Sequence, residues 1–235
     1  GSEMPVLING WGSYRRMAMA LRCQGDQLGV DDGIEGGFEA IAARIGELVK
    51  PEPPRSLGEV IEKARAFWPL LRIKPRRVKR GVCQEVVWKG EGVDLSMLPV
   101  IRCWPDDGDF AKLGYPAGVN DGIGGVESGE WSGRGRYITL ASIHTVHPDD
   151  VGKKSPKSHN IGMYRVQVLG KRTLAMHWHM HHDGAGHWRA WKARGEAMPV
   201  AVALGGEAVL PYAATAPLPP GISELLLAGY LNSVA

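Results

Sequence analysis

The chain has 235 residues, of which 44% are hydrophobic and 23% are charged, and its net charge at pH 7 is +3. This composition is ordinary for a soluble globular protein of one large or two small domains, and the small charge gives no support for a nucleic-acid partner. The sequence contains no run of about 18 apolar residues, so it predicts no membrane-spanning helix.

Cysteine usage indicates a reducing environment. Cys23, Cys83 and Cys103 are odd in number, far apart and in no Cys-x-x-Cys pair, and the sequence shows no signal-peptide pattern. We therefore expect reduced, buried thiols in a cytoplasmic protein.

The first predicted region covers residues 1–74 and is mostly helical. One strand and three helices are expected, at 4–10, 13–22, 38–49 and 56–69. The helices follow from apolar residues at helical spacing, and the last begins with a capping-box pattern between Ser56 and Glu59.

The second predicted region covers residues 75–221 and is rich in strands and turns, while 222–235 begin a further helix. Strands are expected at 83–90, 136–147, 159–169, 172–182 and 198–206. The pair on either side of Gly170-Lys171 predicts a β-hairpin. Helices are expected at 184–195 and from Ser223 onward. The strand count fits an α+β protein with a small closed or split barrel.

Histidines are concentrated in one stretch, residues 174–188. Five of the eight histidines lie there, at His177, His179, His181, His182 and His187. If the stretch is a strand, His177, His179 and His181 share one face, which suggests a zinc site. However, neighbouring positions on one strand splay apart, and the stretch has neither the spacing of structural zinc sites nor an HExxH motif. A polar ladder without a metal is the alternative.

A second polar group stands just before this stretch, in the sequence NIGMYR at residues 160–165. As one strand it would place Asn160 and Gly162 on one face and Met163 and Arg165 on the other, unless a bulge intervenes. Gly162 would allow a ligand to approach the backbone closely. Asparagine, histidine and a carboxylate together would suit Mn²⁺ or Mg²⁺ bound with phosphate oxygens.

Six blocks of sequence, in order, resemble the UbiD family of prenylated-FMN-dependent non-oxidative decarboxylases. They lie at 4–21, 83–100, 103–105, 159–188, 199–206 and 216–231. The resemblance implies a split, flavin-reductase-like β-barrel flanked by helices. It also implies a reversible decarboxylation of an aromatic or α,β-unsaturated carboxylic acid.

The resemblance also implies ligands for the cofactors. Asn160, His181 and Glu224 match the family's ligands for a divalent ion, usually Mn²⁺ (or Mg²⁺), which bridges to the cofactor phosphate. Backbone carbonyls near Ile161 and at Ala213, Ala214 and Ala216 match a potassium site. The positions matching contacts to prenylated FMN are Asn160, Ile161, Gly162, Met163, Arg165, His181 and Pro217.

Arg165 matches the arginine of the family's catalytic Glu-Arg-Glu network, where it would hold the substrate carboxylate. The two glutamates of that network have no counterpart in this sequence, so we expect the chain to correspond to the central, cofactor-binding part of the family. The resemblance implies a flavin prenyltransferase that supplies the cofactor, and homo-oligomeric full-length relatives.

Departures from the family keep other functions open. Residues 117–157 are only loosely similar and are expected to hold an insertion, and His177 and His179 stand where other residue types are expected. One alternative is a non-catalytic flavin- or metal-binding module, or a subunit whose partner chain brings the glutamates. Another is a histidine-based zinc hydrolase, although the zinc-site spacings are absent.

Overall fold

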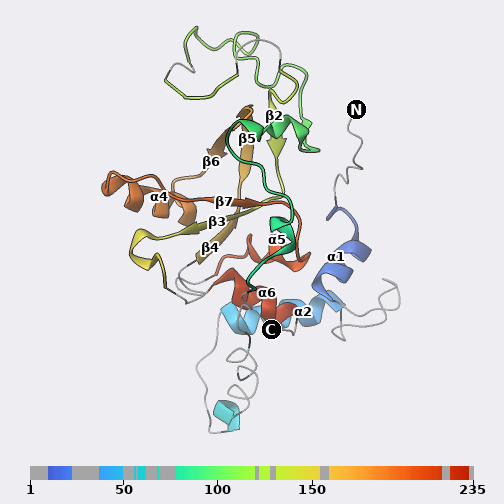
Figure 1. Cartoon of the computed structure of the whole chain (residues 1–235). Coiled ribbons are helices and arrows are strands. Elements are labelled where there is room, and N and C mark those ends of the chain that lie inside the picture. Colours follow the sequence, from blue (N-terminus) through green and yellow to red (C-terminus); the bar gives the residue numbers. More distant parts are fainter. Residues whose placement is uncertain are drawn as a thin grey trace. The chain divides into compact units, whose positions relative to one another are not determined.

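The computed structural model describes most of the chain in two compact units (Figure 1). The described residues are 10–22, 37–49, 56, 58–61, 68, 73, 78–119, 122–127, 131–153, 159–218 and 223–232. Among these, the first unit consists of residues 78–141 and 163–182, and the second unit contains the others. The three regions predicted along the sequence, 1–74, 75–221 and 222–235, stay a prediction.

The first unit is built on an antiparallel sheet of four strands in the order β1-β2-β5-β6. These strands are β1 (Ile101–Arg102), β2 (Arg136–Ile138), β5 (Arg165–Gly170) and β6 (Thr173–His177). The short 3₁₀ turns η2 (Val82–Gln84), η3 (Gly90–Gly92) and η4 (Leu95–Met97) precede it in the chain. One face is buried, with Ile138, Val166 and Val168 at most 1% exposed, as alternation along a strand requires.

The predicted β-hairpin is confirmed by β5 and β6, which Lys171 and Arg172 connect. The loop at 122–127 packs against it, since Glu127 N donates to Leu169 O and Thr173 Oγ1 donates to Gly124 O, both at 3.1 Å. A β-carbon on Gly170 would lie 1.9 Å from Gly125 O. Glycine is therefore the residue that permits this close approach.

The second unit contains a three-stranded sheet in the order β4-β3-β7, formed by β4 (His159–Met163), β3 (Ser142–Val146) and β7 (Ala201–Ala203). Met163, the last residue of β4, is counted with the first unit. The turn η5 (Pro148–Asp150) follows β3, and helix α4 (Asp183–Ala193) packs near both. Trp191 Nε1 on α4 donates to Val146 O at 2.8 Å, which fastens the helix to the strand.

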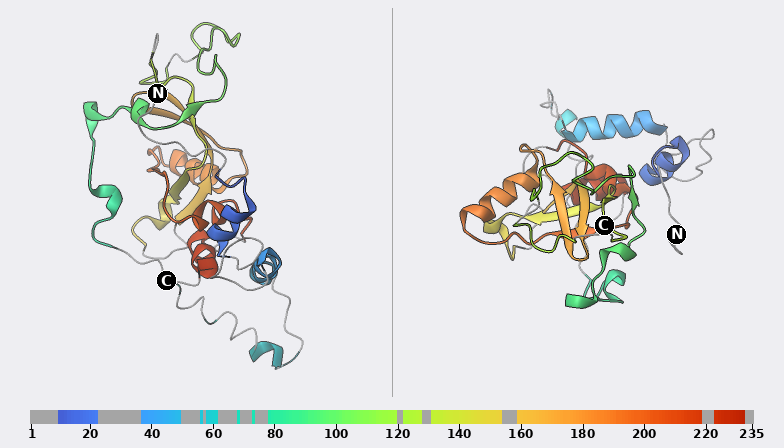
Figure 2. Two further views of the ribbon diagram at one scale, coloured as in Figure 1. Left: turned by 90° about the vertical axis from the view of Figure 1, so that its right-hand side faces the viewer. Right: turned by 90° about the horizontal axis from the view of Figure 1, so that it is seen from above.

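The core of the second unit lies between helices. They are α1 (Tyr14–Leu21), α2 (Gly37–Val49), α5 (Val209–Ala213) and α6 (Glu224–Asn232). Their buried residues include Ala18, Ile41, Val209 and Leu227. Figure 2 shows α1 beside α6, where Arg22 Nη1 donates to Asn232 O at 2.9 Å.

The helices predicted at 13–22, 38–49, 184–195 and from Ser223 are confirmed. For the helix predicted at 56–69, residues 58–61 are helical and Glu59 N donates to Ser56 Oγ at 3.2 Å. The rest of that helix, apart from Trp68, lies outside the described residues, as does nearly all of the strand predicted at 4–10.

The strand predicted at 83–90 is wrong. The segment holds the turn η2 followed by bends, and Val86, Val87 and Trp88 are all more than half exposed. Gly81 N donates to Gln84 Oε1 at 2.9 Å, and Glu85 N donates to Val82 O at 3.0 Å. A strand needs a neighbour for its backbone groups, and since the described residues supply none here, local turns satisfy them instead.

The strand predictions at 136–147, 159–169 and 198–206 are also corrected, and 159–169 divides at Tyr164 into β4 and β5. Residues 136–147 form two strands, β2 and β3, which belong to different sheets, and only Ala201–Ala203 of the stretch 198–206 is a strand. The prediction of buried thiols is wrong as well, because Cys83 and Cys103 are free but exposed. Cys23 lies outside the described residues.

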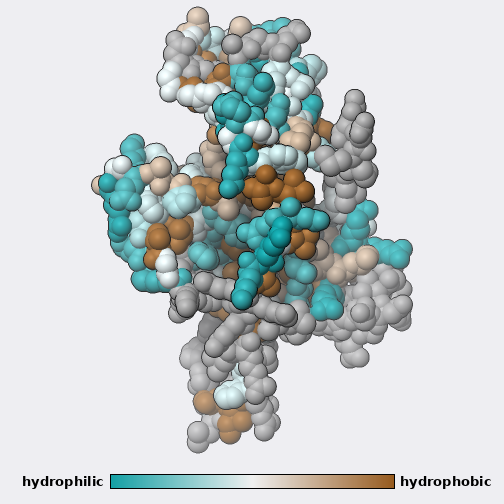
Figure 3. Space-filling model, in the orientation of Figure 1, coloured by the Kyte–Doolittle hydropathy of each residue, from teal (hydrophilic) through white to brown (hydrophobic). Residues whose placement is uncertain are grey.

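The fold is a mixture of helices and antiparallel sheets, and its described strands form no closed barrel. The split, flavin-reductase-like barrel stays a prediction. The surface in Figure 3 mixes hydrophilic and hydrophobic side chains. Within the described ranges, every helix is too short or too polar to cross a membrane.

Candidate metal and cofactor site

Glu224 is the first residue of α6 and, at 9% exposure, the one charged side chain that is buried among the described residues. Ser223 caps the helix, because its Oγ accepts a hydrogen bond from Leu225 N at 3.3 Å. Glu224 Oε2 accepts from Ile161 N, on β4, at 3.1 Å. Glu224 therefore lies at a defined position beside β4.

Burial raises the pKa of the Glu224 carboxyl, and the negative charge of Asp183 raises it further. Hydrogen bonds from backbone N–H groups, including that of Ile161, oppose this rise. A buried carboxylate with few neutralising partners favours either a proton or a cation.

Asn160 precedes Ile161 on β4, so two of the three predicted divalent-ion ligands meet at one peptide unit. Asn160 Nδ2 donates to Thr145 Oγ1, on β3, at 3.2 Å, and Thr145 Oγ1 lies 3.0 Å from His187 Nδ1, on α4. Burial, and then the nearby His147, lower the pKa of His187. This lowered pKa favours a neutral ring at neutral pH.

The remaining predicted ligand, His181, belongs to the first unit, in a turn that the sequence does not suggest. Strand β6 ends at His177, so the prediction that three histidines share a strand face is wrong. His179 and His182 close the turn, because His182 N donates to His179 O at 3.0 Å and His179 N donates to His182 Nδ1 at 3.1 Å. Helix α4 begins immediately afterwards at Asp183, whose charge suits a helix N-terminus.

No three histidine, cysteine, aspartate or glutamate side chains gather closely enough to hold a metal ion in the described parts of the chain. This finding gives the zinc hydrolase no support. An asparagine-histidine-glutamate set differs in kind, since one of its ligands is an amide oxygen.

Arg165 is the first residue of β5 and is exposed. The prediction that it continues one strand with Asn160 is wrong, because Tyr164 separates β4 from β5. The Tyr164 ring packs against Trp178 and His182, with centroids 6.0 and 5.1 Å away. These contacts fix the point at which the chain leaves one sheet and enters the other.

Across the first unit's sheet, Arg165 pairs with His177, and its guanidinium lies 5.8 Å from the centre of the Tyr137 ring. Burial raises the pKa of Tyr137, and Asp107 adds to the rise, whereas the Arg165 cation lowers it. Arg165 is thus a cation held by an aromatic ring, with its side chain open to solvent.

A family model described as the UbiD 3-octaprenyl-4-hydroxybenzoate carboxy-lyase Rift-related domain matches residues 76–234, which is more than half of the chain. The chain belongs to the UbiD family. An uncharacterized protein of Aquifex aeolicus is 37% identical over 233 residues, which cover 98% of this chain and 38% of that protein. This UbiD-family chain therefore spans well under half of the relative's length.

Solved structures show the same fold. The closed form of vanillic acid decarboxylase from Sedimentibacter hydroxybenzoicus gives a TM-score of 0.62 at 21% identity, over 99% of this chain and 38% of that one. The 3,4-dihydroxybenzoic acid decarboxylase of Klebsiella pneumoniae gives 0.51 at 17% identity, over 94% of this chain and 34% of that one. At these identities the likeness concerns the fold alone.

The residues predicted to bind potassium lie at the C-terminal end of α5 in this UbiD-family chain. Ala213 ends the helix, Ala214 caps it, and Ala216 N donates to Ala213 O at 3.2 Å. Carbonyl groups at the end of a helix point away from it and carry partial negative charge, which suits a cation. Pro217 follows and is exposed, whereas Ile161 and Gly162 are buried and Met163 is half-buried.

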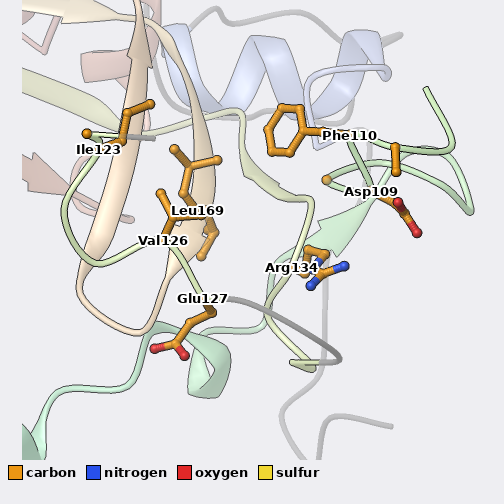
Figure 4. Close-up of a pocket in the computed structure, with 11 residues that line it drawn as sticks. Asp109, Phe110, Ile123, Val126, Glu127, Arg134 and Leu169 are labelled. Atoms are coloured by element: carbon orange, nitrogen blue, oxygen red, sulfur yellow. The ribbon is translucent and has the colours of Figure 1, made fainter. Parts of the chain in front are cut away.

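A cavity of about 520 Å³ lies in the first unit (Figure 4). Its apolar wall includes Phe110, Ile123, Val126 and Leu169, and its charged residues are Asp109, Glu127 and Arg134. Several of these residues fall within 117–157, the stretch that was expected to hold an insertion relative to the UbiD family. None of the predicted site residues lines this cavity.

Sequence reasoning missed Thr145 and His187, the two residues linked to Asn160. A threonine within an apolar strand is typical of β-structure, and its sequence gives no sign of a polar partner. His187 lies on the helix predicted at 184–195, but nothing in the sequence indicates its contact with β3. The contact between them depends on how α4 packs against β3.

Proposed function

We propose that this chain is the metal- and cofactor-binding part of a UbiD-type carboxy-lyase. The full protein would carry out reversible, non-oxidative decarboxylation of an aromatic or α,β-unsaturated carboxylic acid. The observation that carries the proposal is the meeting of Asn160 and the buried Glu224 at the Ile161 peptide, inside a chain of this family.

The donor set fits the proposed divalent ion. Glu224 would supply a carboxylate oxygen, Asn160 an amide oxygen, and His181, from the first unit, an imidazole nitrogen. Such a mixed set with open positions suits Mn²⁺ or Mg²⁺ that also binds phosphate oxygens. The carbonyls at Ala213, Ala214 and Ala216, with that of Ile161, would hold K⁺ nearby.

Prenylated FMN, when bound, would supply the electron-accepting chemistry that allows CO₂ to leave. The residues of this chain would bind and orient. Ile161, Gly162, Met163 and Pro217 would contact the cofactor, and the forked guanidinium of Arg165 would hold the substrate carboxylate. The two catalytic glutamates would come from sequence outside this chain.

The proposal includes the wider setting that the family resemblance implies. The strands would complete a split, flavin-reductase-like barrel, and the full-length protein would form homo-oligomers in the cytoplasm. A flavin prenyltransferase would supply the cofactor. The protein would act on a small carboxylic acid and would bind neither nucleic acid nor a membrane.

The experiment is to co-express the full-length protein that carries this chain with a flavin prenyltransferase. Purified protein should show flavin absorbance, contain manganese, and release CO₂ from at least one member of a panel of aromatic and unsaturated acids. Arg165→Lys is the matched variant. It keeps the charge but lacks the fork, so flavin and manganese should remain while turnover falls.

Two outcomes would contradict the proposal in different ways. A full-length protein that never takes up flavin would overturn it. A protein that binds flavin and manganese but turns over only when another chain is added would instead favour the binding module, or the subunit whose partner brings the glutamates.

A further inference from the structure

Thr145 occupies a buried position on β3, at 3% exposure, directly between Asn160 and His187. Its two side-chain partners come from β4 and α4, and all three residues belong to the second unit. A buried hydroxyl in this position must satisfy its hydrogen-bonding capacity through these neighbours.

The direction of the hydrogen bonds follows from the Asn160 amide and from the tautomer of His187. The Asn160 Nδ2 group can only donate, so Thr145 Oγ1 accepts from it. The hydroxyl hydrogen of Thr145 then has His187 Nδ1 as its acceptor, 3.0 Å away. This direction requires the neutral tautomer of His187 with its hydrogen on Nε2, which leaves Nδ1 as an acceptor. The order is therefore Asn160 to Thr145 to His187.

His187 is held in place independently of Asn160. Trp191, one turn later on α4, donates to Val146 O, the residue next to Thr145 on β3. The His147 ring also packs edge-on against the His187 ring, with centroids 5.7 Å apart. His187, the last residue in this row of hydrogen bonds, is thus held against the same strand that carries Thr145.

We propose that Thr145 and His187 are positioning residues that orient the Asn160 amide so that Oδ1, rather than Nδ2, faces the divalent ion. The inference rests on the proposed function, since it takes Asn160 as a metal ligand. An amide is planar, so fixing Nδ2 fixes Oδ1. Without the hydroxyl, the amide can turn over and present an NH₂ group, which does not bind a metal.

The test uses four variants of the chain and the dissociation constant of Mn²⁺, measured from the electron paramagnetic resonance of the free ion. Thr145→Val keeps the shape but removes the hydroxyl, and it should weaken Mn²⁺ binding about 10- to 100-fold, the range typical of residues that hydrogen-bond to a metal ligand. Thr145→Ser restores the hydroxyl and should bind within about threefold of wild type, well below that range. His187→Phe keeps the ring packing, removes the acceptor, and should bind with intermediate affinity.

Asn160→Ala distinguishes a failure of the positioning role from a failure of the proposed metal site. If wild type binds Mn²⁺, Asn160→Ala does not, and Thr145→Val binds as tightly as wild type, the inference is overturned and the metal site stands. Equal loss in Thr145→Val and Thr145→Ser would also overturn it, because the hydroxyl would not be the cause. Equal binding by wild type and Asn160→Ala would instead contradict the metal site.

Thermal unfolding of each variant shows whether it is folded. If Thr145→Val does not fold, His187→Phe decides the question, since it leaves β3 unchanged. His187→Phe binding Mn²⁺ as tightly as wild type would then overturn the inference.

Discussion

The two units differ in whether their polar side chains are buried or exposed. All the polar or charged side chains buried in the described residues, Ser142, Thr145, Ser223 and Glu224, belong to the second unit. The first unit instead exposes its candidate residues, among them Arg165 and His181. The second unit therefore buries its polar groups among hydrogen-bond partners, whereas the first unit presents its candidate side chains to solvent.

Burying polar side chains costs free energy of folding in the second unit, whereas the exposed side chains of the first unit have little such cost. Burying a carboxyl such as Glu224 is unfavourable unless hydrogen bonds or a counter-ion compensate, and the raised pKa of this group shows that the compensation is incomplete. An exposed cation such as Arg165 has almost no such cost. The contrast is what we expect if the second unit holds ligands of the proposed divalent ion in fixed positions.

The largest expected effect is on the affinity for Mn²⁺, and it is tested by comparing a variant in each unit. Asn160→Ala should weaken Mn²⁺ binding by more than about 100-fold, because it removes a ligand of the proposed ion. This loss exceeds the range typical of residues that only hydrogen-bond to a metal ligand. His177→Ala removes a histidine from the end of β6 and should change the affinity by less than about twofold, far below that range. Calorimetric titration with Mn²⁺ measures both, and similar losses in the two variants would contradict the assignment.

A smaller effect concerns stability without metal. Because burial raises the pKa of Glu224, the folded chain holds this proton more tightly than the unfolded chain does. The protonated group therefore favours folding, and this benefit is lost as pH rises from the unfolded pKa through the folded one. At pH 7 the charged form destabilises the metal-free chain.

Glu224→Gln removes that charge and can still accept the hydrogen bond from Ile161 N. It should raise the Tm of the metal-free chain at pH 7 by about 2–4 °C, the shift that 1 kcal/mol produces at this size. Adding Mn²⁺ should raise the Tm of wild type but not of the variant. A variant less stable than wild type at pH 7 would show that the carboxylate is well compensated without metal.

The smallest effect is expected at Arg165. Since its side chain is exposed and contacts the Tyr137 ring, Arg165→Ala should change the free energy of unfolding by less than about 0.5 kcal/mol. In the full-length protein, the same substitution should abolish turnover if Arg165 holds the substrate. Chemical denaturation and CO₂ release measure the two effects, and a large loss of stability would show that Arg165 is structural.

Local patterns in the sequence predicted several elements well. The period of apolar residues located the helices at 13–22 and 38–49, and Gly170-Lys171 located the hairpin. Glu224 was expected at the start of a helix, and it lies there beside the residue after Asn160. Each of these features depends on residues close together in the sequence, or on a family pattern that spans them.

Other features required contacts that the sequence does not encode locally. Residues 83–90 have the composition of a strand but lack a partner among the described strands, and 136–147 divide between two sheets. The histidine stretch alternates like a strand, yet it ends as a turn because His179 and His182 bond to each other and α4 begins at Asp183.

The sequence by itself determined the family and the principal helices, and it supplied the residue types of the proposed manganese and flavin-phosphate site. Only the tertiary structure decided that Asn160 and Glu224 meet at the Ile161 peptide, and that Thr145 contacts both Asn160 and His187. The physical reason is that helix period and turn chemistry act within a few residues. Burial and hydrogen bonding between β3, β4, α4 and α6, in contrast, depend on packing between segments that are up to 63 residues apart in the sequence.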